Sequence, residues 1–228
     1  MFVDAALDDP EALRSIDAVL REVAGWGAEV RRADAASAAA LDGLTASDRP
    51  RAVIAGGADG RLFRAVLEPV CPVPFVAWPH PSLPGWAGPL DLVVMMSVDD
   101  SDHDALMLVA EAVRRGCALV VAAAPESALT AAAAGRGTTL LPAATRDATA
   151  LAVPVLRALH VLGLGPPVEA EPVAVALDDV AVRCAASNPV DLNPAKEIAL
   201  ALADDVPVVW GGSVLAARAA RRVAEALR

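Results

Sequence analysis

Short runs of apolar residues alternate with helical patterns along the middle of this chain. "RAVIAGG" (51–57), "DLVVMMS" (91–97) and "CALVVAAA" (117–124) are the clearest, and 72–78 and 138–141 complete the set. Strands that expose one face to water alternate apolar and polar residues, so continuous apolar runs indicate strands covered on both faces. The pattern therefore predicts an α/β fold, with a five-stranded parallel sheet flanked by helices in three layers.

Helical patterns occupy the segments between and after these strands. They fall at 61–70, 104–116, 125–137 and 146–164, and Pro154 is expected to bend the last of them. Alternating strands and helices of this length are typical of one doubly wound domain of about 150 residues.

The first 45 residues are predicted to be helical. Pro10 stands at a helix start, where proline is tolerated, and Gly25 and Gly27 lie past the predicted end of the first helix. The apolar residues of this helix recur at helical spacing and are Leu13, Ile16, Val19, Leu20 and Val23. We expect them to form one buried face.

The Pro- and Gly-rich segment "GPPVEAEP" (165–172) is the best domain boundary. We predict N-terminal helices at 1–45, a first domain at 46–165 and a second unit at 166–228. That unit offers a single strand pattern, "VPVVW" (206–210), before a final helix. One strand cannot form a sheet, so we expect the unit to be part of a longer protein or to pair with a partner.

Composition excludes several classes of function. The 228 residues carry a net charge of −10, which argues against nucleic acid and anionic membrane surfaces, because both require basic patches. No uncharged apolar run is long enough to span a membrane, and the start lacks the order of a signal peptide. Cys71, Cys117 and Cys184 have no metal or disulfide spacing, which predicts free thiols in a cytoplasmic protein.

Two strand–glycine–helix junctions are candidate ligand contacts. The first contains Gly56 and Gly57, and the second contains Gly212 and Ser213. Glycine lets a backbone approach a ligand, and the following helix offers free N–H groups to an anion. Glycine is equally used for tight turns alone, and both interpretations stay open. Neither junction has a dinucleotide or Walker motif, so no cofactor is expected.

The loop "SVDDSDHD" (97–104) presents carboxylates where an α/β fold often binds anions. Ser97 and Ser101 could donate hydroxyls to a phosphate, but Asp99, Asp100, Asp102 and Asp104 surround them. Each carboxylate within roughly 5 Å of a phosphate costs about 1 kcal/mol or more.

Three interpretations of this acidic loop compete. In the first, Ser101 or Asp102 caps the following helix, and Asp102 and Asp104 stabilise its positive end. In the second, the loop is a degenerate phosphate site, which is compatible with capping. In the third, the aspartates and His103 bind a divalent cation, although the spacing matches no ordered calcium loop.

The remaining polar candidates are isolated in sequence. His80 lies in the Pro-rich connector "WPHPSLPGW", and His160 lies in a helix; neither has a nucleophile partner pattern, so both are interpreted as structural. Arg146 follows the last strand and precedes a helix. It is well placed to meet an anion, although such arginines are usually solvated.

Together these stretches resemble the sugar isomerase (SIS) fold, and within it the bifunctional phosphoglucose/phosphomannose isomerases and their TobH-like actinobacterial branch. The element order, the turn "AGGADG", the connector "WPHPSLPGWAGP" and "NPAKEIALAL…VPVVWGGSVLAARAARR" carry the resemblance, which covers most of residues 20–228. It implies a first SIS domain, the start of a second, a phosphorylated hexose as ligand and a homodimer.

The acidic loop departs from the family's Ser-x-Ser-Gly-Asn-Thr motif. Ser97 keeps the first serine, but Asp99, Asp100, Ser101 and Asp102 replace the next four residues of the motif. The resemblance therefore implies that most hydroxyl ligands of the phosphate are lost. Arg146 matches the family's arginine before the long helix, with Thr145 in place of the usual proline.

The family's catalytic residues are also incomplete. Its glutamate follows the Arg-rich helix, where Glu225 lies about three residues early, and its later histidine has no counterpart. We expect a catalytically impaired or regulatory sugar-phosphate-binding protein. Two alternatives stay open. One is an active isomerase whose Glu and His lie outside this chain, and the other is a metal-dependent enzyme that uses the aspartates.

Overall fold

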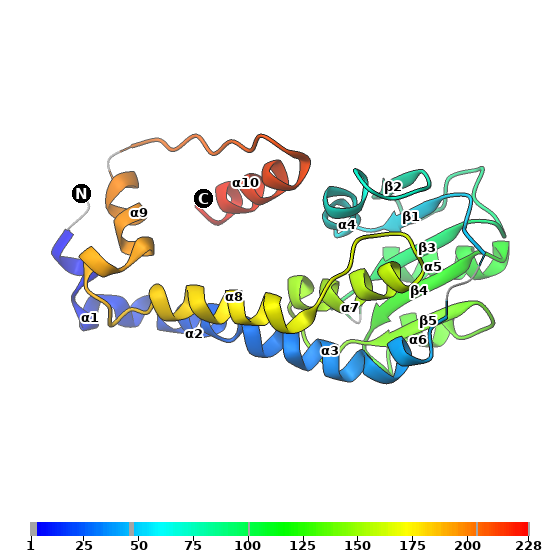
Figure 1. The fold of residues 1–228 in the computed structure, drawn as a ribbon, viewed down its shortest axis with the longest axis horizontal. Helices are drawn as coiled ribbons and strands as arrows, with labels where there is room; N and C mark the ends of the chain where they lie inside the picture. Colours follow the sequence, from blue (N-terminus) through cyan, green and yellow to red (C-terminus); the bar gives the residue numbers. More distant parts are fainter. Residues whose placement is uncertain (1–3, 46–47, 100, 204, 228) are drawn as a thin grey trace.

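The computed structural model describes residues 4–45, 48–99, 101–203 and 205–227. Its centre is a five-stranded parallel sheet of order β2-β1-β3-β4-β5 (Figure 1). The strands are β1 (Val53–Gly56), β2 (Phe75–Trp78), β3 (Leu92–Met96), β4 (Ala118–Ala123) and β5 (Thr138–Pro142). Val53 pairs with Phe75 on one side and with Leu92 on the other, so β1 is an inner strand. The predicted parallel sheet is confirmed.

Alternate residues of the inner strands enter two separate apolar cores. Val53 and Ala55 belong to one core and Ile54 to the other, and all three are fully buried. This two-sided burial explains why the strand sequences are apolar at successive positions.

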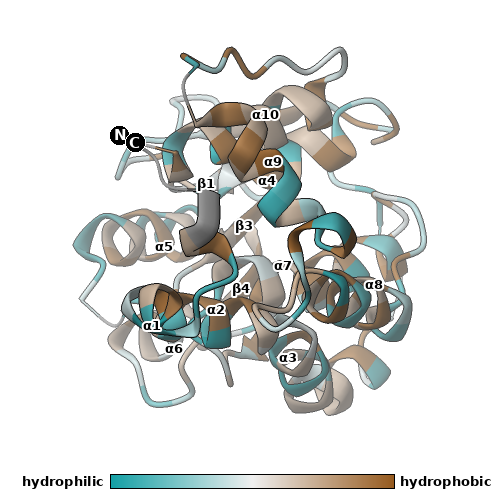
Figure 2. Cartoon of the chain, turned by 90° about the vertical axis from the view of Figure 1, so that its left-hand side faces the viewer, coloured by the Kyte–Doolittle hydropathy of each residue, from teal (hydrophilic) through white to brown (hydrophobic). Residues whose placement is uncertain are grey.

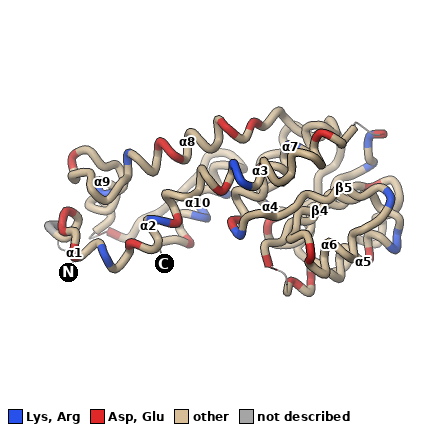
Figure 3. The backbone as a smooth tube through the Cα atoms, turned by 90° about the horizontal axis from the view of Figure 1, so that it is seen from below, with Lys and Arg blue, Asp and Glu red and all other residues tan. Residues whose placement is uncertain are grey.

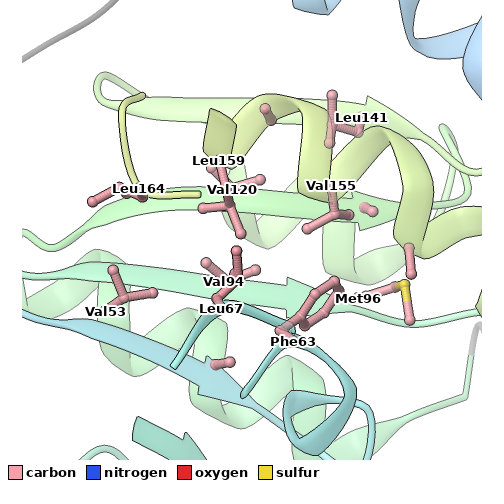
Figure 4. Close-up of a cluster of buried hydrophobic side chains, with 14 of the residues drawn as sticks. Val53, Phe63, Leu67, Val94, Met96, Val120, Leu141, Val155, Leu159 and Leu164 are labelled. Carbon is pink, nitrogen blue, oxygen red and sulfur yellow. The ribbon is translucent and has the colours of Figure 1, made fainter. Parts of the chain in front are cut away.

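Helices cover both faces of the sheet. The first face packs against α3 (Trp26–Asp42), α4 (Gly60–Leu67) and α7 (Ala148–Val161). Its core includes Phe63, Leu67 and Leu159, as Figure 4 shows. The second face packs against α5 (His103–Arg115) and α6 (Ala128–Ala133). The three predicted layers are therefore present.

Capping side chains set the starts of two helices later than the sequence pattern predicted. Ser127 accepts the amide of Thr130 at the start of α6, and Asp147 accepts the amide of Ala150 at the start of α7. Pro154 lies inside α7 and is buried. These boundaries follow from hydrogen bonds that satisfy the first free amides of each helix.

The N-terminal helices form an arm that extends beyond the sheet (Figure 1). The predicted first helix is broken into α1 (Pro10–Leu13), a 3-10 turn and α2 (Asp17–Ala24). Its apolar face is not buried as expected, since Ile16 is 44% exposed and Val19 59% exposed. The arm has too few neighbouring elements to cover that face. Figure 2 shows that polar and apolar residues are mixed along the arm.

The helix α8 (Ala170–Arg183) packs along α3 and also contacts α2 of the arm. Gly27 of α3 permits this approach, because a Cβ there would lie 2.8 Å from the main-chain oxygen of Ala174. Arg31 bridges the pair by donating to Glu171 at 2.9 Å and to Asp178 at 2.8 Å.

The C-terminal segment contains α9 (Pro194–Leu202) and α10 (Val214–Ala226). The strand predicted at 206–210 is wrong, because this segment has no strand assignment, and Val206 and Trp210 are 93% and 87% exposed. No strand of the described chain pairs with it, so its β-type sequence has no ladder to join. Among the described residues, no helix has both the length and the hydropathy of a membrane span.

Lys196, the single lysine, connects α9 to the arm through hydrogen bonds. Its ammonium group donates to Asp8 at 2.9 Å and to the main-chain oxygens of Ala186 and Asn188 at 2.9 and 2.7 Å. The side chain is 7% exposed, so its three donors are all satisfied in a nearly dry environment.

We predict that Gly27→Ala destabilises the protein by about 1–3 kcal/mol, because the new methyl group would force α3 away from α8. Urea unfolding followed by circular dichroism measures the change. Gly43→Ala is the matched control, since a Cβ at Gly43 meets Ala39 at an ordinary 3.4 Å. Equal destabilisation by both substitutions would contradict the proposed close packing.

We also predict that Lys196→Met lowers the free energy of unfolding by about 1–3 kcal/mol, because two partly buried carbonyl groups lose their donor. Asp8→Asn should cost less, since the amide oxygen still accepts from the ammonium group. Thermal unfolding of the two variants tests this order, and the reverse order would show that the charge of Asp8 dominates.

Candidate functional site

The carboxyl edge of the sheet contains a topological switch point between β1 and β3. The chain leaves β1 toward β2 on one side and leaves β3 toward β4 on the other. Loops that diverge in this way leave a crevice at the strand ends, which is where open α/β sheets bind ligands. Two cavities, of about 940 and 490 Å³, lie along this edge.

The polar groups of the acidic loop after β3 form hydrogen bonds with one another and with the start of α5. The Ser97 hydroxyl donates to the main-chain oxygen of Asp99 at 2.9 Å and accepts the Asp99 amide at 3.2 Å. The Asp99 carboxylate accepts both the amide and the hydroxyl of Ser101, at 2.8 and 2.7 Å. The Asp102 carboxylate accepts the amide of Ala105 at 2.9 Å and is thus the N-cap of α5.

These bonds decide between the interpretations of the loop. Capping by Asp102 is confirmed, and capping by Ser101 is wrong. The amides of Ser101 and Ala105, which could have met a phosphate, already donate to carboxylates. Hydrogen bonds from Ser101, with a smaller contribution from Arg146, also lower the pKa of Asp99, so this carboxylate stays charged at neutral pH.

The divalent-cation interpretation gains no support from the described residues. In that part of the chain, no three His, Cys, Asp or Glu side chains are arranged so that they could hold one ion. Asp100, which entered the hypothesis, lies outside the described residues.

The glycine junctions differ in what their glycines do. Gly56 is buried, and a Cβ there would lie 2.9 Å from Leu108, so this glycine allows β1 and α5 to pack. Gly57 has φ +73° and lines the smaller cavity. Gly212 and Ser213 line neither cavity, and Ser213 caps α10 by accepting the amide of Ala216.

The larger cavity brings together Ser97 and Arg146, two residues that the sequence suggested as ligand contacts. It lies between the carboxyl ends of β3, β4 and β5, the α2–α3 junction and α10. Its charged lining consists of Arg21, Arg32, Arg146, Arg222, Glu22, Glu29 and Asp147. Arginines therefore outnumber carboxylates here, although the whole chain carries a net charge of −10.

Two of these arginines are without an ion-pair partner among the described residues. Arg21 and Arg32 pair with Asp17 and Glu29 of their own helices. Arg146 and Arg222 form no ion pair within 4 Å in the described part of the chain. An unpaired guanidinium in a cavity is an available donor for a carboxylate or a phosphate.

Two carboxylates of the larger cavity are held by hydrogen bonds. The Thr145 hydroxyl, followed by Arg32, holds the pKa of Glu29 below its ordinary value. Asp147 is engaged as the N-cap of α7. Glu29 therefore lacks the raised pKa of a carboxyl group that acts as a general acid at neutral pH.

The smaller cavity lies on the other side of the acidic loop. Its charged and polar lining consists of Arg61, His80, Asp102, Asp104, Arg218, Arg221 and Glu225. His80 packs edge-on against Trp78, with ring centroids 5.0 Å apart, as expected for a histidine with a structural role. His160 lies elsewhere, with its ring nitrogen 3.0 Å from the main-chain oxygen of Gly165.

No protein-family model and no curated protein matches the chain. Among solved structures, it is similar to a Bacillus subtilis protein provisionally described as a phosphosugar isomerase (17% identity, TM-score 0.46, 69% of this chain and 51% of that one). It is also similar to the C-terminal domain of glucosamine-fructose-6-phosphate aminotransferase from Francisella tularensis (11% identity, TM-score 0.47, covering 72% of this chain and 54% of that one). A third similar structure is an E. coli CFT073 protein in complex with A5P (15% identity, TM-score 0.43, covering 78% of this chain and 96% of that one).

The chain spans about half the length of the first two of these structures. Sequence identities of 11–17% show nothing about this chain beyond a likeness of fold. The assignment to the TobH-like branch stays a prediction.

Sequence reasoning missed the residues that the terminal helices contribute. Glu29 comes from α3 and Arg222 from α10, and both line the same cavity as Arg146. The arginine-rich pattern "RAARR" (218–222) was the available signal, but nothing in it indicates which part of the sheet the helix contacts.

We predict that Asp102→Ala destabilises the protein by about 0.5–2 kcal/mol, as the loss of an N-cap does. Ser101→Ala should change stability by a few tenths of a kcal/mol at most, because its hydroxyl binds only the exposed Asp99. Chemical unfolding compares the two. A larger loss from Ser101→Ala would contradict the assignment of the cap.

Proposed function

We propose that this protein binds a phosphorylated sugar, such as a hexose phosphate, in the larger cavity, without catalysing its isomerisation by its own residues. The observation that carries the proposal is that Arg146 and Arg222 line one cavity at the carboxyl edge and have no ion-pair partner among the described residues. The phosphate would meet these arginines, because the amides of the acidic loop are already engaged.

The same cavity suits the rest of such a ligand. Carboxyl oxygens accept hydrogen bonds from sugar hydroxyls, and Glu22, Glu29 and Asp147 line the wall. The volume of about 940 Å³ lies within the usual range for small-molecule sites. The sequence resemblance to phosphosugar isomerases supports the same class of ligand.

Binding without catalysis follows from the chemistry of the lining. Aldose–ketose isomerisation needs a base whose pKa is matched to proton transfer near neutral pH. Glu29 is held ionised with a lowered pKa, and no histidine is among the described residues that line the cavity. A regulatory or carrier role therefore fits these residues better than turnover. The homodimer and the cytoplasmic location remain predictions.

Isothermal titration calorimetry with fructose 6-phosphate tests the proposal, with fructose as the unphosphorylated control. We expect saturable heat with the phosphate ester only. Arg146→Gln and Arg222→Gln should each weaken binding about 10-fold or more, because each removes a charge-assisted contact. Arg136→Gln, in the exposed turn before β5, should bind as the wild type does.

Three outcomes would contradict or revise the proposal. Absence of heat at millimolar ligand would refute sugar-phosphate binding. Loss of binding on adding a chelator would favour the metal-dependent alternative. Conversion of fructose 6-phosphate to an aldose phosphate by the same preparation, followed in a coupled assay, would establish the active isomerase instead.

A further inference from the structure

The C-terminal helix α10 lies on the molecule with little apolar contact. None of its residues is buried, and its main neighbour is α4. Val214, Leu215 and Val223 are each close to half exposed, so the apolar side chains of α10 do not anchor it. A helix of 13 residues is marginal in water by itself, and something other than burial must favour its docked position.

Charge is the feature that α10 and the surface beneath it share. Figure 3 shows basic residues along α10, and three of them line the two cavities. Arg222 lines the larger cavity, while Arg218 and Arg221 line the smaller one. The helix therefore spans the boundary between the two cavities.

Carboxylates at the starts of two helices, α4 and α5, lie near these arginines. Asp102 and Asp104 line the smaller cavity together with Arg218 and Arg221. Asp59, in the turn between β1 and α4, is partly buried; burial raises its pKa, while Arg218 and Arg222 act in the opposite direction. The carboxylates near the switch point therefore lie close to the basic residues of α10.

We propose that α10 is a lid over the carboxyl edge, held by these charges and tightened when an anionic ligand occupies the larger cavity. Attraction between partly exposed charges is modest and screened by salt, so the lid opens readily. The carboxylates at the switch point favour the closed lid by facing its arginines.

The coupling to ligand rests on the proposed function. A phosphate in the larger cavity would contact Arg146, which is fixed after β5, and Arg222, which moves with α10. The second contact exists only when α10 is docked, so ligand affinity differs between the open and closed lid. A ligand with such a difference must shift the population toward the closed state.

Limited trypsin digestion of the full chain measures opening of the lid, because α10 must unfold locally before trypsin cleaves after its arginines. Mass spectrometry separates cleavage in α10 from cleavage at Arg136, the internal control. Asp59→Asn should accelerate cleavage in α10 about two- to fivefold, because it removes a partly buried charge that attracts Arg218 and Arg222. Asp42→Asn, at the end of α3, should leave it unchanged.

The same digestion in rising sodium chloride tests the electrostatic part. We expect cleavage in α10 to accelerate with salt more than cleavage at Arg136 does. Equal rates of cleavage in α10 for wild type and Asp59→Asn, together with no salt effect specific to α10, would contradict the proposal that charge holds α10 in its docked position.

Fructose 6-phosphate at saturating concentration tests the coupling. It should slow cleavage in α10 of the wild type but not of Arg222→Gln, in which Arg218 and Arg221 remain as cleavage sites. If calorimetry shows binding but α10 is not protected, the lid fails and the proposed function stands. If calorimetry shows no binding, the proposed function fails, while the Asp59→Asn and salt experiments still decide whether charge holds α10.

Discussion

Burial of the inner strands on both faces is the constraint on which the rest of the structure depends. Val53 and Ile54 enter different cores, so helices must cover both sides of the sheet. Parallel strands then require long crossover connections, most of which contain a helix here, and the chain reverses its winding direction once. That reversal, between β1 and β3, opens the carboxyl edge at which the two cavities lie.

The acidic loop after β3 illustrates how a fold can keep a local geometry while changing its chemistry. Amides at a helix start attract an anion, and Asp99 and Asp102 supply one from within the chain. The loop is thereby satisfied without a ligand. In the proposed function, the positive charge for an external anion comes instead from Arg146 and Arg222, which line the neighbouring cavity.

A sheet of this order hosts many functions, so the site must carry the functional argument. The features specific to this chain are the arginines that outnumber carboxylates in one cavity and the basic helix placed between two cavities. Both concern anions, and both involve the terminal helices rather than the strands. The central domain supplies the frame, and the terminal segments supply most of the charged groups around it.

The sequence by itself determined the five strands of the sheet and the layers, and it limited the cap of α5 to Ser101 or Asp102, because apolar periodicity and capping act between residues close in the chain. It also suggested Ser97, Gly57 and Arg146, which follow strand ends. It could not determine that "VPVVW" (206–210) would find no partner strand, or that the first helix would leave Ile16 and Val19 exposed.

Only the tertiary structure brought Glu29, Arg146 and Arg222 to one cavity. These residues lie far apart in sequence, and their approach depends on how the arm and α10 pack against the sheet. That packing is the sum of many weak contacts between distant segments, and no local pattern of the sequence encodes it.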